Sequence, residues 1–542
     1  MPPGRLPLRN LRFGNIDARY EVLTRDRNTL DHFRESFVTP TGMPLDEFEK
    51  GLRFFVHGMK GAGKTAFLRY IQLKVTEDQC LTQFVSFANE ISDQERERII
   101  KESGIKIFEQ KGIEAVTECV NLWILFIFNQ LAQLIEENRQ MFSSHRNINL
   151  FLQLMDKLHD SQDKTILTWL QGVLKKGKYK IKTKYVQFTG KGSSGDLERD
   201  YTVDQIVRHA FELLTELSWE GKKRIYVFFD ELNLSFASRV QHKRDSILIR
   251  DLIIAIDRVN SFFIKIDKPV YLLASARSEV LNVITTPTHE INKILLDRGR
   301  ELRWFPLTAG GEWPIMSLFV KKVRASEVVG RYRQTEDVFR EYFQSGLFGM
   351  SPSSLVVELT WCNPRDLVLL FGEAALKAVG GEQVFDEVLI NRVLDRYSTE
   401  AWREKTEELN VEYAPAEIAA LKKILLNFRS VFKLDHFEAE GRSKSQGDQV
   451  IKQFMSTRKP LKILEDLYRI GIIGQSSREG TGNNLAQFTE HWAYRGDQNF
   501  DPHAWMVIHR ALWTDLRLGR LSLNSGMSLH RQERYSRKPR NK

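Results

Sequence analysis

Cysteine is scarce in this chain of 542 residues, which contains only Cys80, Cys119 and Cys362. The three lie far apart, so they form neither the dense framework of a small disulfide-stabilised protein nor the paired spacing of a zinc site. Structural disulfides persist mainly in oxidising compartments. The sequence therefore favours a reducing environment, and we expect a cytoplasmic protein.

Long hydrophobic runs are also missing. The most apolar stretch, residues 120–135, is interrupted by two asparagines and two glutamines. A helix that spans a bilayer needs about 20 predominantly apolar residues, and a secretory signal carries an apolar core of its own. We therefore expect no signal and no membrane partner, and we predict a buried helix at residues 116–137.

No catalytic set of the Ser-His-Asp or Cys-His kind stands out, and the sequence has no internal repeat, heptad run or low-complexity tract. His491, His503 and His509 lie near one another, but the tryptophans around them favour packing over metal binding. No segment resembles a nuclease, a protease or an NAD-cleaving domain. A cutting or killing activity would therefore belong to a separate effector protein.

The positive charge of the chain, +10 in total, is unevenly distributed. Residues 410–542 carry +8, of which the last twelve residues supply +5, and residues 174–200 carry another +5. Concentrated basic charge indicates an anionic partner, most simply nucleic acid. A solvated face together with a basic tail would give the same pattern, so both interpretations stay open.

A glycine-rich motif is the most informative feature present, and it reads Gly58-Met-Lys-Gly-Ala-Gly-Lys-Thr65. It has the Gly, four free positions, Gly, Lys and Thr of a phosphate-binding loop. The apolar run 52–56 predicts a strand before it, and residues 66–73 predict a helix after it. Glycines let backbone N–H groups approach phosphate oxygens, and the helix directs its positive dipole end at the same anion. The predicted nucleotide-binding residues are Gly58, Gly61, Gly63, Lys64, Thr65 and Ala66.

Two acidic residues complete the predicted nucleotide site. The apolar run 224–229 indicates a central parallel strand, and it ends in Asp230 and Glu231. Thr65 and Asp230 would then hold Mg²⁺, while Lys64 would contact the β- and γ-phosphates. Glu231 would activate the attacking water as general base.

Other strand ends supply further polar candidates. A strand predicted at residues 268–274 leads into Ser275 and Arg277, either of which would sit between the acidic pair and the γ-phosphate, and we favour Arg277 for its charge. A last strand is predicted at residues 301–305. Beside it lie three arginines, one of which would act in trans on the γ-phosphate bound by a neighbouring copy: Arg298, Arg300 and Arg303.

Lysine alternates with other residues along residues 178–188, which is typical of an extended strand. A glycine- and serine-rich loop follows. We predict a basic strand or hairpin inserted into the nucleotide-binding domain at about residues 174–200. It would track a phosphate backbone, or it would be a solvated edge whose lysines prevent aggregation, and the two interpretations stay open.

These parts, in this order, resemble the AAA+ and STAND branch of P-loop ATPases over residues 15–400. The resemblance implies ATP and Mg²⁺ as ligands and a helical lid behind the sheet. The lid signature here is Trp361-Cys-Asn-Pro-Arg365. In such ATPases the arginine of this signature lies over the γ-phosphate, a role that would fall to Arg365, and Pro364 suits the first turn of a helix.

Within this branch the layout is similar to initiator ATPases of the origin-recognition kind and to bacterial P-loop ATPases, some of which sit among antiphage defence genes. In both groups a winged helix follows the lid. The candidate recognition helix here carries acids, Glu465 and Asp466, as well as bases, so its contact with DNA stays open. The elements predicted for the winged helix are helices at 415–428 and 462–470 and strands at 472–474 and 487–494.

The sequence thus predicts an α/β fold with a P-loop NTPase core, a helical lid and a C-terminal winged-helix domain. We expect an ATP-hydrolysing molecular switch that engages DNA, in antiphage defence or another DNA transaction, as a homo-oligomer or with an effector protein. The alternative is an ATP-controlled oligomeric scaffold that regulates a separate effector without binding DNA. The expected segments are a lead segment (1–50), the ATPase core (51–308), the lid (309–400), the winged helix (410–520) and a disordered basic tail (521–542).

Overall fold

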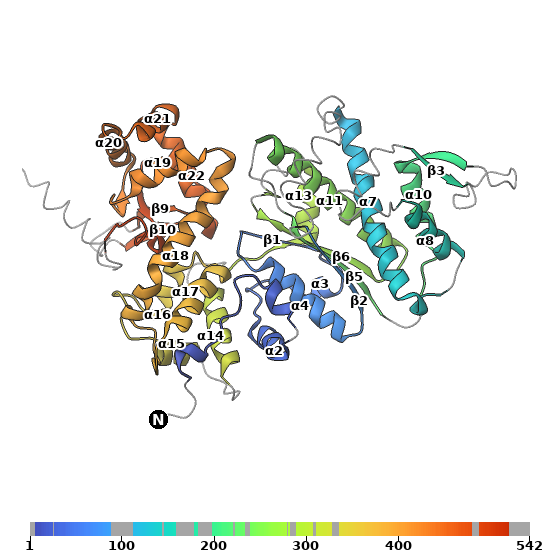
Figure 1. The fold of residues 1–542 in the computed structure, drawn as a ribbon, viewed down its shortest axis with the longest axis horizontal. Coiled ribbons are helices and arrows are strands. Elements are labelled where there is room, and N and C mark those ends of the chain that lie inside the picture. The colour runs from blue at the N-terminus through green and yellow to red at the C-terminus, as the bar shows by residue number, and fades with distance from the viewer. Residues whose placement is uncertain are drawn as a thin grey trace, which may run out of the picture.

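The computed structural model contains three units, two of them stacked one above the other and the third beside them in Figure 1. A parallel sheet with its helices forms the sheet unit, helices α14–α18 form the helical unit, and the elements from α19 onward form the C-terminal unit. The described residues are 6–24, 26–87, 112–143, 146–158, 178–182, 198–219, 223–232, 239–278, 280–281, 289–306, 311–327, 335–479 and 487–519.

The sheet has five strands in the order β2-β5-β6-β1-β7. All neighbouring strands are parallel, so their carboxyl ends meet at one edge of the sheet. This confirms the predicted α/β class with a parallel sheet. The strands are β1 (Phe55–Gly58), β2 (Leu81–Ser86), β5 (Ile225–Leu232), β6 (Val270–Arg277) and β7 (Gly299–Glu301).

Helices cover both faces of the sheet, which is why the central strands are apolar along most of their length. Helix α4 packs against β1, β2, β5 and β6, whereas α7 and α11 pack against each other and against β2 and β6 respectively. Figure 1 shows α4 on one side of the sheet and α7 with α11 on the other. The helices of this unit are α3 (Leu45–Glu49), α4 (Lys64–Glu77), α7 (Gly112–Glu137), α8 (Arg146–Leu158), α10 (Val203–Leu214), α11 (Arg239–Lys265) and α13 (His289–Arg298).

The most apolar segment of the chain lies in α7, as predicted. From Val120 to Phe128 every side chain is buried, and they pack with α8, α10 and α11. Within the part of the chain that the structure describes, no helix combines the length and the hydropathy needed to cross a bilayer.

The last strand of the sheet differs from the prediction. The sequence predicts a strand at residues 301–305, but only Glu301 lies in β7. Pairing ends there because the partner strand β1, whose His57 lies opposite Glu301, turns into the glycine-rich loop at Gly58. Leu302 and Trp304 are nevertheless buried, so their apolar character reflects packing rather than strand pairing.

The N-terminal segment packs on the helical unit. The Leu8 amide donates to the Glu382 carbonyl at 3.0 Å, and the Phe13 ring lies 5.5 Å from Phe319 and 6.1 Å from Phe371. Helix α2 packs on α14, while α1 packs on α4 of the sheet unit. The elements involved are η1 (Leu8–Asn10), α1 (Arg19–Val22), α2 (Arg27–Ser36), α14 (Pro314–Ser326), α15 (Thr335–Tyr342), α16 (Pro352–Leu359), α17 (Pro364–Lys377) and α18 (Glu387–Glu407).

The C-terminal unit combines helices with an antiparallel sheet in the order β10-β9-β11-β8. The helices expected at 415–428 and 462–470 and the two expected strands are present with shifted ends. Strands β8 and β11 were not predicted, and β11 lies between β9 and β8. The elements are α19 (Pro415–Leu425), β8 (Val431–Phe432), α20 (Leu434–Ser445), α21 (Gln449–Thr457), α22 (Pro460–Arg469), β9 (Ile473–Glu479), β10 (Gln487–His491) and β11 (Trp505–Ile508).

The predicted basic insertion contains a two-stranded antiparallel ribbon of β3 (Lys178–Lys182) and β4 (Glu198–Thr202). Residues 183–188 of the predicted strand lie outside the described residues. The register places Lys180 opposite Asp200 and Lys182 opposite Glu198. Figure 1 shows the ribbon at the end of the long axis that lies farthest from the C-terminal unit.

Candidate nucleotide-binding site

The glycine-rich motif forms the connection between β1, which ends at Gly58, and α4, which begins at Lys64. Gly61 has φ +83° and Gly63 has φ +88°, a conformation that side-chain-bearing residues rarely adopt. The Lys64 ammonium donates to the carbonyls of Gly58 at 2.9 Å and Met59 at 2.8 Å. The first turn of α4 lines the cavity through Lys64, Thr65 and Ala66, and the first backbone N–H groups of a helix have no partner within the helix.

The acidic pair lies at the carboxyl end of β5, next to the loop. Pairing between β5 and β6 is irregular between Phe229 and Leu232, and Glu231 has φ +61°. Asp230 is buried, and its Oδ1 accepts a hydrogen bond from the Ser275 hydroxyl of β6. Its Oδ2 is buried without a hydrogen-bond partner among the described residues. An orphaned carboxylate oxygen in this position fits a hard cation as its partner.

Glu231 is held by two neighbours through the same oxygen. Its Oε2 accepts from the Ser86 hydroxyl of β2 at 2.7 Å and from the Arg19 guanidinium of α1 at 3.0 Å. Burial raises the pKa of the Glu231 carboxyl above its ordinary value, while the Ser86 hydrogen bond and the Arg19 charge lower it. A carboxylate with a raised pKa is suited to accept a proton near neutral pH.

Arg19 was not singled out by the sequence, and its role depends on the N-terminal segment folding over the site. Its side chain also contacts Asp17, whose Oδ2 accepts from the guanidinium Nε at 2.8 Å. Arg19 thereby joins the N-terminal segment to the acidic pair at the sheet edge. A lone arginine in a segment without a motif gives no signal from which this contact could be predicted.

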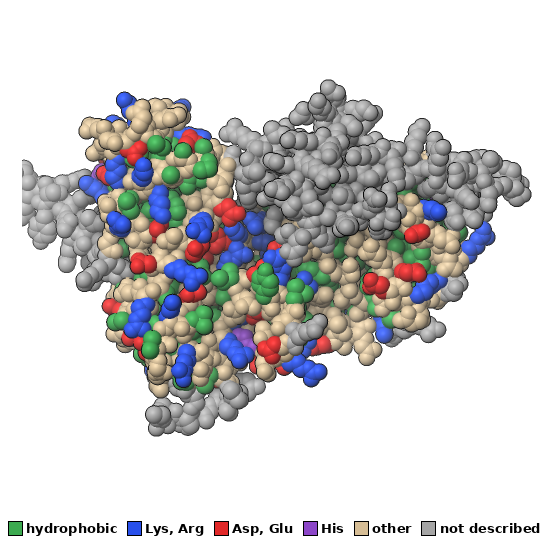
Figure 2. Space-filling model, viewed as in Figure 1, with side chains coloured by type: hydrophobic (Ala, Val, Ile, Leu, Met, Phe, Trp, Pro, Cys, Tyr) green, Lys and Arg blue, Asp and Glu red, His purple; other side chains and the backbone are tan. Residues whose placement is uncertain are grey.

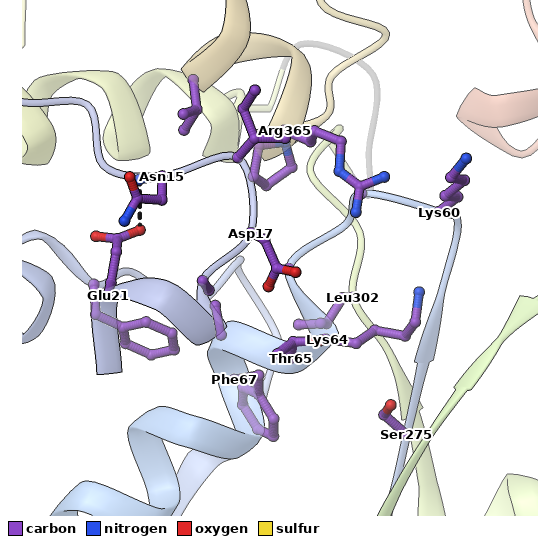
Figure 3. Close-up of a pocket in the computed structure, with 18 of the residues that line it drawn as sticks. Asn15, Asp17, Glu21, Lys60, Lys64, Thr65, Phe67, Ser275, Leu302 and Arg365 are labelled. Carbon is purple, nitrogen blue, oxygen red and sulfur yellow. Dashed lines mark hydrogen bonds between the residues drawn. The ribbon is translucent and has the colours of Figure 1, made fainter. Parts of the chain in front are cut away.

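The loop, the acidic pair and the N-terminal segment line one cavity. Figure 3 shows Lys64, Thr65 and Ser275 on one side of it and Asn15 and Glu21 on the other, with Asp17 between. The predicted residues that line it are Gly61, Gly63, Lys64, Thr65, Ala66, Asp230, Glu231, Arg277 and Arg365. The sequence thus identified one side of the cavity and missed the side built by the N-terminal segment and α14.

The residues present fit Mg²⁺ only as a partly solvated ion. Thr65 and Asp230 offer a hydroxyl and a carboxylate, oxygen ligands of the kind that Mg²⁺ prefers. The described residues contain no group of three or more His, Cys, Asp or Glu side chains placed to hold a metal ion. Mg²⁺ usually takes one or two carboxylates and completes its coordination with water and phosphate oxygens, so this sparse set suits it.

The start of α17 packs directly on the loop. Asn363 caps the helix by accepting from the Arg365 amide at 3.0 Å, and its side-chain amide donates to the Lys60 carbonyl at 2.7 Å. A Cβ on Gly61 would lie 2.6 Å from the Asn363 side chain, so only glycine allows this approach. The helical unit therefore contacts the phosphate-binding loop through Asn363, whose role was not predicted.

Arg365 reaches the cavity, but its guanidinium is engaged by an acid of α18. Its NH1 donates to Glu404 Oε1 at 2.7 Å, and Lys60 of the loop pairs with Glu404 at 3.7 Å and also with Glu407. The two cations therefore share Glu404 at the border between the loop and the helical unit. The expected position of Arg365 over a γ-phosphate stays a prediction.

The remaining candidates are placed as follows. Arg277 lines the cavity, but Ser275 is the residue that contacts Asp230. The three arginines proposed to act in trans make contacts near their own strand: Arg298 to the Leu52 carbonyl, Arg300 to the Gly299 carbonyl and Arg303 to Glu301. His509 is buried and stacks on Trp361 with ring centroids 3.7 Å apart, which confirms packing as its role.

This geometry can bind a phosphate chain between the loop and the acidic pair and can present a carboxylate to a water molecule beside it. Comparison with protein-family models finds none that matches the chain, and comparison with curated proteins finds no match either. The function of the chain is therefore inferred from the residues that line this cavity.

Proposed function

We propose that the chain is a nucleotide-dependent molecular switch that binds ATP with Mg²⁺ and hydrolyses it. One observation carries the proposal: the glycine-rich loop and the acidic pair, separated widely in the sequence, line the same cavity. A phosphate-binding loop alone is a motif. A loop that faces a buried, unpartnered carboxylate oxygen and a second carboxylate with a raised pKa is a site with the parts that phosphoryl transfer to water needs.

The loop supplies binding and orientation. Backbone N–H groups of the loop and of the first turn of α4 would hold the β- and γ-phosphates. Lys64 would exchange its present contacts to the Gly58 and Met59 carbonyls for contacts to phosphate oxygens, which are stronger because both partners are charged. Mg²⁺, held by Thr65 and Asp230, would neutralise phosphate charge when bound.

Glu231 is the proposed general base. It must be ionised to accept a proton from water, so hydrolysis should rise with pH through its raised pKa. Ser86 and Arg19 orient its carboxylate through Oε2, which leaves Oε1 as the oxygen to face the attacking water.

The switch would act through the contact between the loop and α17. Because Asn363 is bonded to the loop and Arg365 is engaged by Glu404, a bound γ-phosphate would compete with Glu404 for Arg365. That competition gives the nucleotide a differential affinity for two arrangements of the helical unit, which is the requirement for a population shift. In an oligomer, an arginine of one copy would contact the γ-phosphate bound by its neighbour, so the nucleotide would also affect the contact between the two copies.

The proposed output is engagement of DNA, and the support for it is the concentrated positive charge. The basic ribbon and the C-terminal unit lie at opposite ends of the molecule, so one nucleic acid would have to span its length to reach both (Figure 1).

A second candidate output, control of a partner protein without DNA, is favoured by a specific observation. The two bases of α22 are neutralised within the helix: Lys462 pairs with Asp466 at 3.1 Å and Arg469 with Asp466 at 3.4 Å. On the face that Figure 2 shows, basic and acidic side chains are interspersed over the C-terminal unit. A winged helix with such a surface suits protein contact at least as well as phosphate contact.

Hydrolysis of ATP by the purified full chain, with and without double- or single-stranded DNA, tests both parts. The proposal expects Mg²⁺-dependent release of phosphate that Glu231→Gln abolishes while ATP binding is retained. Stimulation by DNA that fades at high salt would support the DNA output, since phosphate contacts release counterions. Equal rates with and without DNA would favour the protein partner, and binding without any hydrolysis would contradict the role given to Glu231.

A further inference from the structure

A pair of buried opposite charges lines the same cavity. Glu21 of α1 is 3% exposed and Lys322 of α14 is 7% exposed, and both line the cavity. Neither has a part in the chemistry proposed above. Figure 3 shows Glu21 across the cavity from Lys64 and Thr65, so a ligand whose phosphates lie on the loop would extend its other end toward Glu21.

The Glu21 carboxylate and the Lys322 ammonium lie close together without a hydrogen bond between them. The nearest oxygen of Glu21, Oε2, lies 4.0 Å from the Lys322 ammonium, beyond hydrogen-bond distance. Its Oε1 accepts from the Asn15 amide at 3.0 Å. Gly14, at φ +89°, lets the chain pass so close that a Cβ there would lie 2.6 Å from Oε1 and 2.7 Å from Oε2. The backbone therefore packs against the whole carboxyl group, but it hydrogen-bonds only Oε1, and Oε2 is the oxygen nearer to the lysine.

Burying two charges that do not touch is costly unless a further group lies between them. Burial raises the pKa of the Glu21 carboxyl and lowers the pKa of the Lys322 ammonium, and in each case the opposite charge of the partner compensates only in part. A ligand that donates to the carboxylate and accepts from the ammonium would satisfy both. The cavity also has an apolar lining, which indicates a ligand with a flat or apolar part. Apolar side chains from three segments line it: Ile16, Phe33, Phe37, Val38, Leu318 and Val368.

We propose that Glu21 and Lys322 read the edge of an adenine ring, with Glu21 Oε2 accepting from the exocyclic amino group and Lys322 donating to the adjacent ring nitrogen. An apolar slot suits a flat aromatic ring, and a donor next to an acceptor on one edge matches the two charges. This inference rests on the proposed function, since the phosphates at the loop are what direct the base toward Glu21.

Guanine fits less well. Its edge carries two neighbouring donors, which a carboxylate binds with both oxygens at once, but Glu21 Oε1 is already used by the Asn15 amide. At the position of the adenine amino group guanine has a carbonyl, which would face the Glu21 carboxylate. Adenine needs one oxygen of Glu21, and one is available.

Equilibrium binding of diphosphates to the wild-type full chain with Mg²⁺ tests the inference without a mutation. The probes are ADP, GDP, purine riboside 5′-diphosphate, which lacks only the amino group, and inorganic tripolyphosphate, which reports on the loop alone. We expect ADP to bind roughly 10- to 100-fold more tightly than GDP and than the purine analogue, because each leaves a buried charge unpaired. Equal binding of ADP and the analogue, or tighter binding of GDP, would overturn the inference while leaving the loop in place. Failure of all four to bind would remove the proposed function as well.

Variants test whether Glu21 and Lys322 cause the expected preference for ADP over GDP. Glu21→Gln and Lys322→Met should reduce the ratio of ADP to GDP affinity at least about tenfold and leave tripolyphosphate binding unchanged. Glu35→Gln is the matched control, because it removes the same charge from an exposed position on the neighbouring helix α2. An unchanged ratio in both site variants, with folding verified by retained tripolyphosphate binding, would contradict the assignment.

Discussion

At the scale of single residues, the site contains two adjacent carboxylates, Asp230 and Glu231, that have different hydrogen-bond partners. Asp230 is buried with one oxygen hydrogen-bonded to Ser275 and the other without a partner among the described residues. Glu231, one residue on, is turned by its positive φ toward Ser86 and Arg19. Neighbouring acids in unlike environments can take unlike roles, and the roles proposed here are cation ligand for Asp230 and general base for Glu231.

Arg19→Ala should move the acid limb of the pH profile of ATP hydrolysis to higher pH. The positive charge of Arg19 lowers the pKa of Glu231, so its removal raises that pKa and a higher pH is needed to ionise the base. Initial rates measured from about pH 5 to 9 would show the shift. Arg19→Lys, which keeps the charge, should stay close to wild type, and an acid limb that does not move in Arg19→Ala would contradict the contact.

At the scale of elements, the start of α17 packs directly on the glycine-rich loop. Gly61 permits it in two ways, through its positive φ and through the space that its missing side chain leaves for Asn363. Glycine at this position therefore allows both the backbone turn of the loop and the close packing of the helical unit.

Gly61→Ala should weaken nucleotide binding and destabilise the protein by more than the strain of its φ alone, which is about 1–2 kcal/mol. Gly346→Ala is the matched control, because Gly346 also has positive φ (+73°) but a Cβ at that position would meet nothing within 4 Å. Urea unfolding and ADP binding of both variants check the prediction. Equal losses of stability in the two variants would show that the contact with Asn363 adds nothing.

The packing of α17 on α18 buries Asp366, and this gives a pH dependence. Burial raises the pKa of Asp366 to about 8, although the Lys405 charge opposes the shift. The folded protein then keeps a proton that the unfolded chain releases near its ordinary pKa, so stability from this group is present at low pH and is lost as the pH rises toward 8. Asp366→Asn should therefore gain stability relative to wild type between pH 5 and pH 8. Urea unfolding at the two pH values measures this, and a constant difference would contradict it.

At the scale of the whole molecule, the helical unit contacts the C-terminal unit through a strained turn between α16 and α17, just before the loop contact. Trp361 and Cys362 both have positive φ, at +43° and +50°, a conformation that costs free energy unless the surroundings enforce it. The Trp361 indole donates to the Gly471 carbonyl at 2.8 Å and stacks on His509. The segment that touches the nucleotide loop at Asn363 is therefore anchored two residues earlier in the C-terminal unit.

Trp361→Ala should destabilise the protein by about 3–5 kcal/mol, because a fully buried indole is removed. It should also separate the unfolding of the C-terminal unit from that of the remainder. Differential scanning calorimetry would show two transitions in place of a more cooperative one. Trp361→Phe keeps a stacking ring but loses the hydrogen bond and part of the buried ring volume, so a smaller loss than in Trp361→Ala is expected. Equal effects of the two substitutions would argue against the stacking contact.

The parts of the site that could be predicted are those formed by short contiguous motifs. The loop at Gly58–Thr65 and the Asp230-Glu231 pair at a strand end are of this kind, and their neighbourhood in the fold followed from parallel strands. Arg19, Glu21 and Lys322 could not be found, because their roles arise when the N-terminal segment packs against α4 and α14. Strand β11 escaped prediction because Trp505–Ile508 is short and pairs with strands that lie earlier in the chain.

The central claim is that the cavity binds a nucleoside triphosphate through its phosphates, and titration of the full chain with ATP, with and without Mg²⁺, tests it most directly. We expect saturable ATP binding that is stronger in the presence of Mg²⁺. Lys64→Ala should weaken this binding by at least about tenfold, and Asp230→Asn should remove its dependence on Mg²⁺. Binding that is absent, or that is the same in wild type and Lys64→Ala, would contradict it.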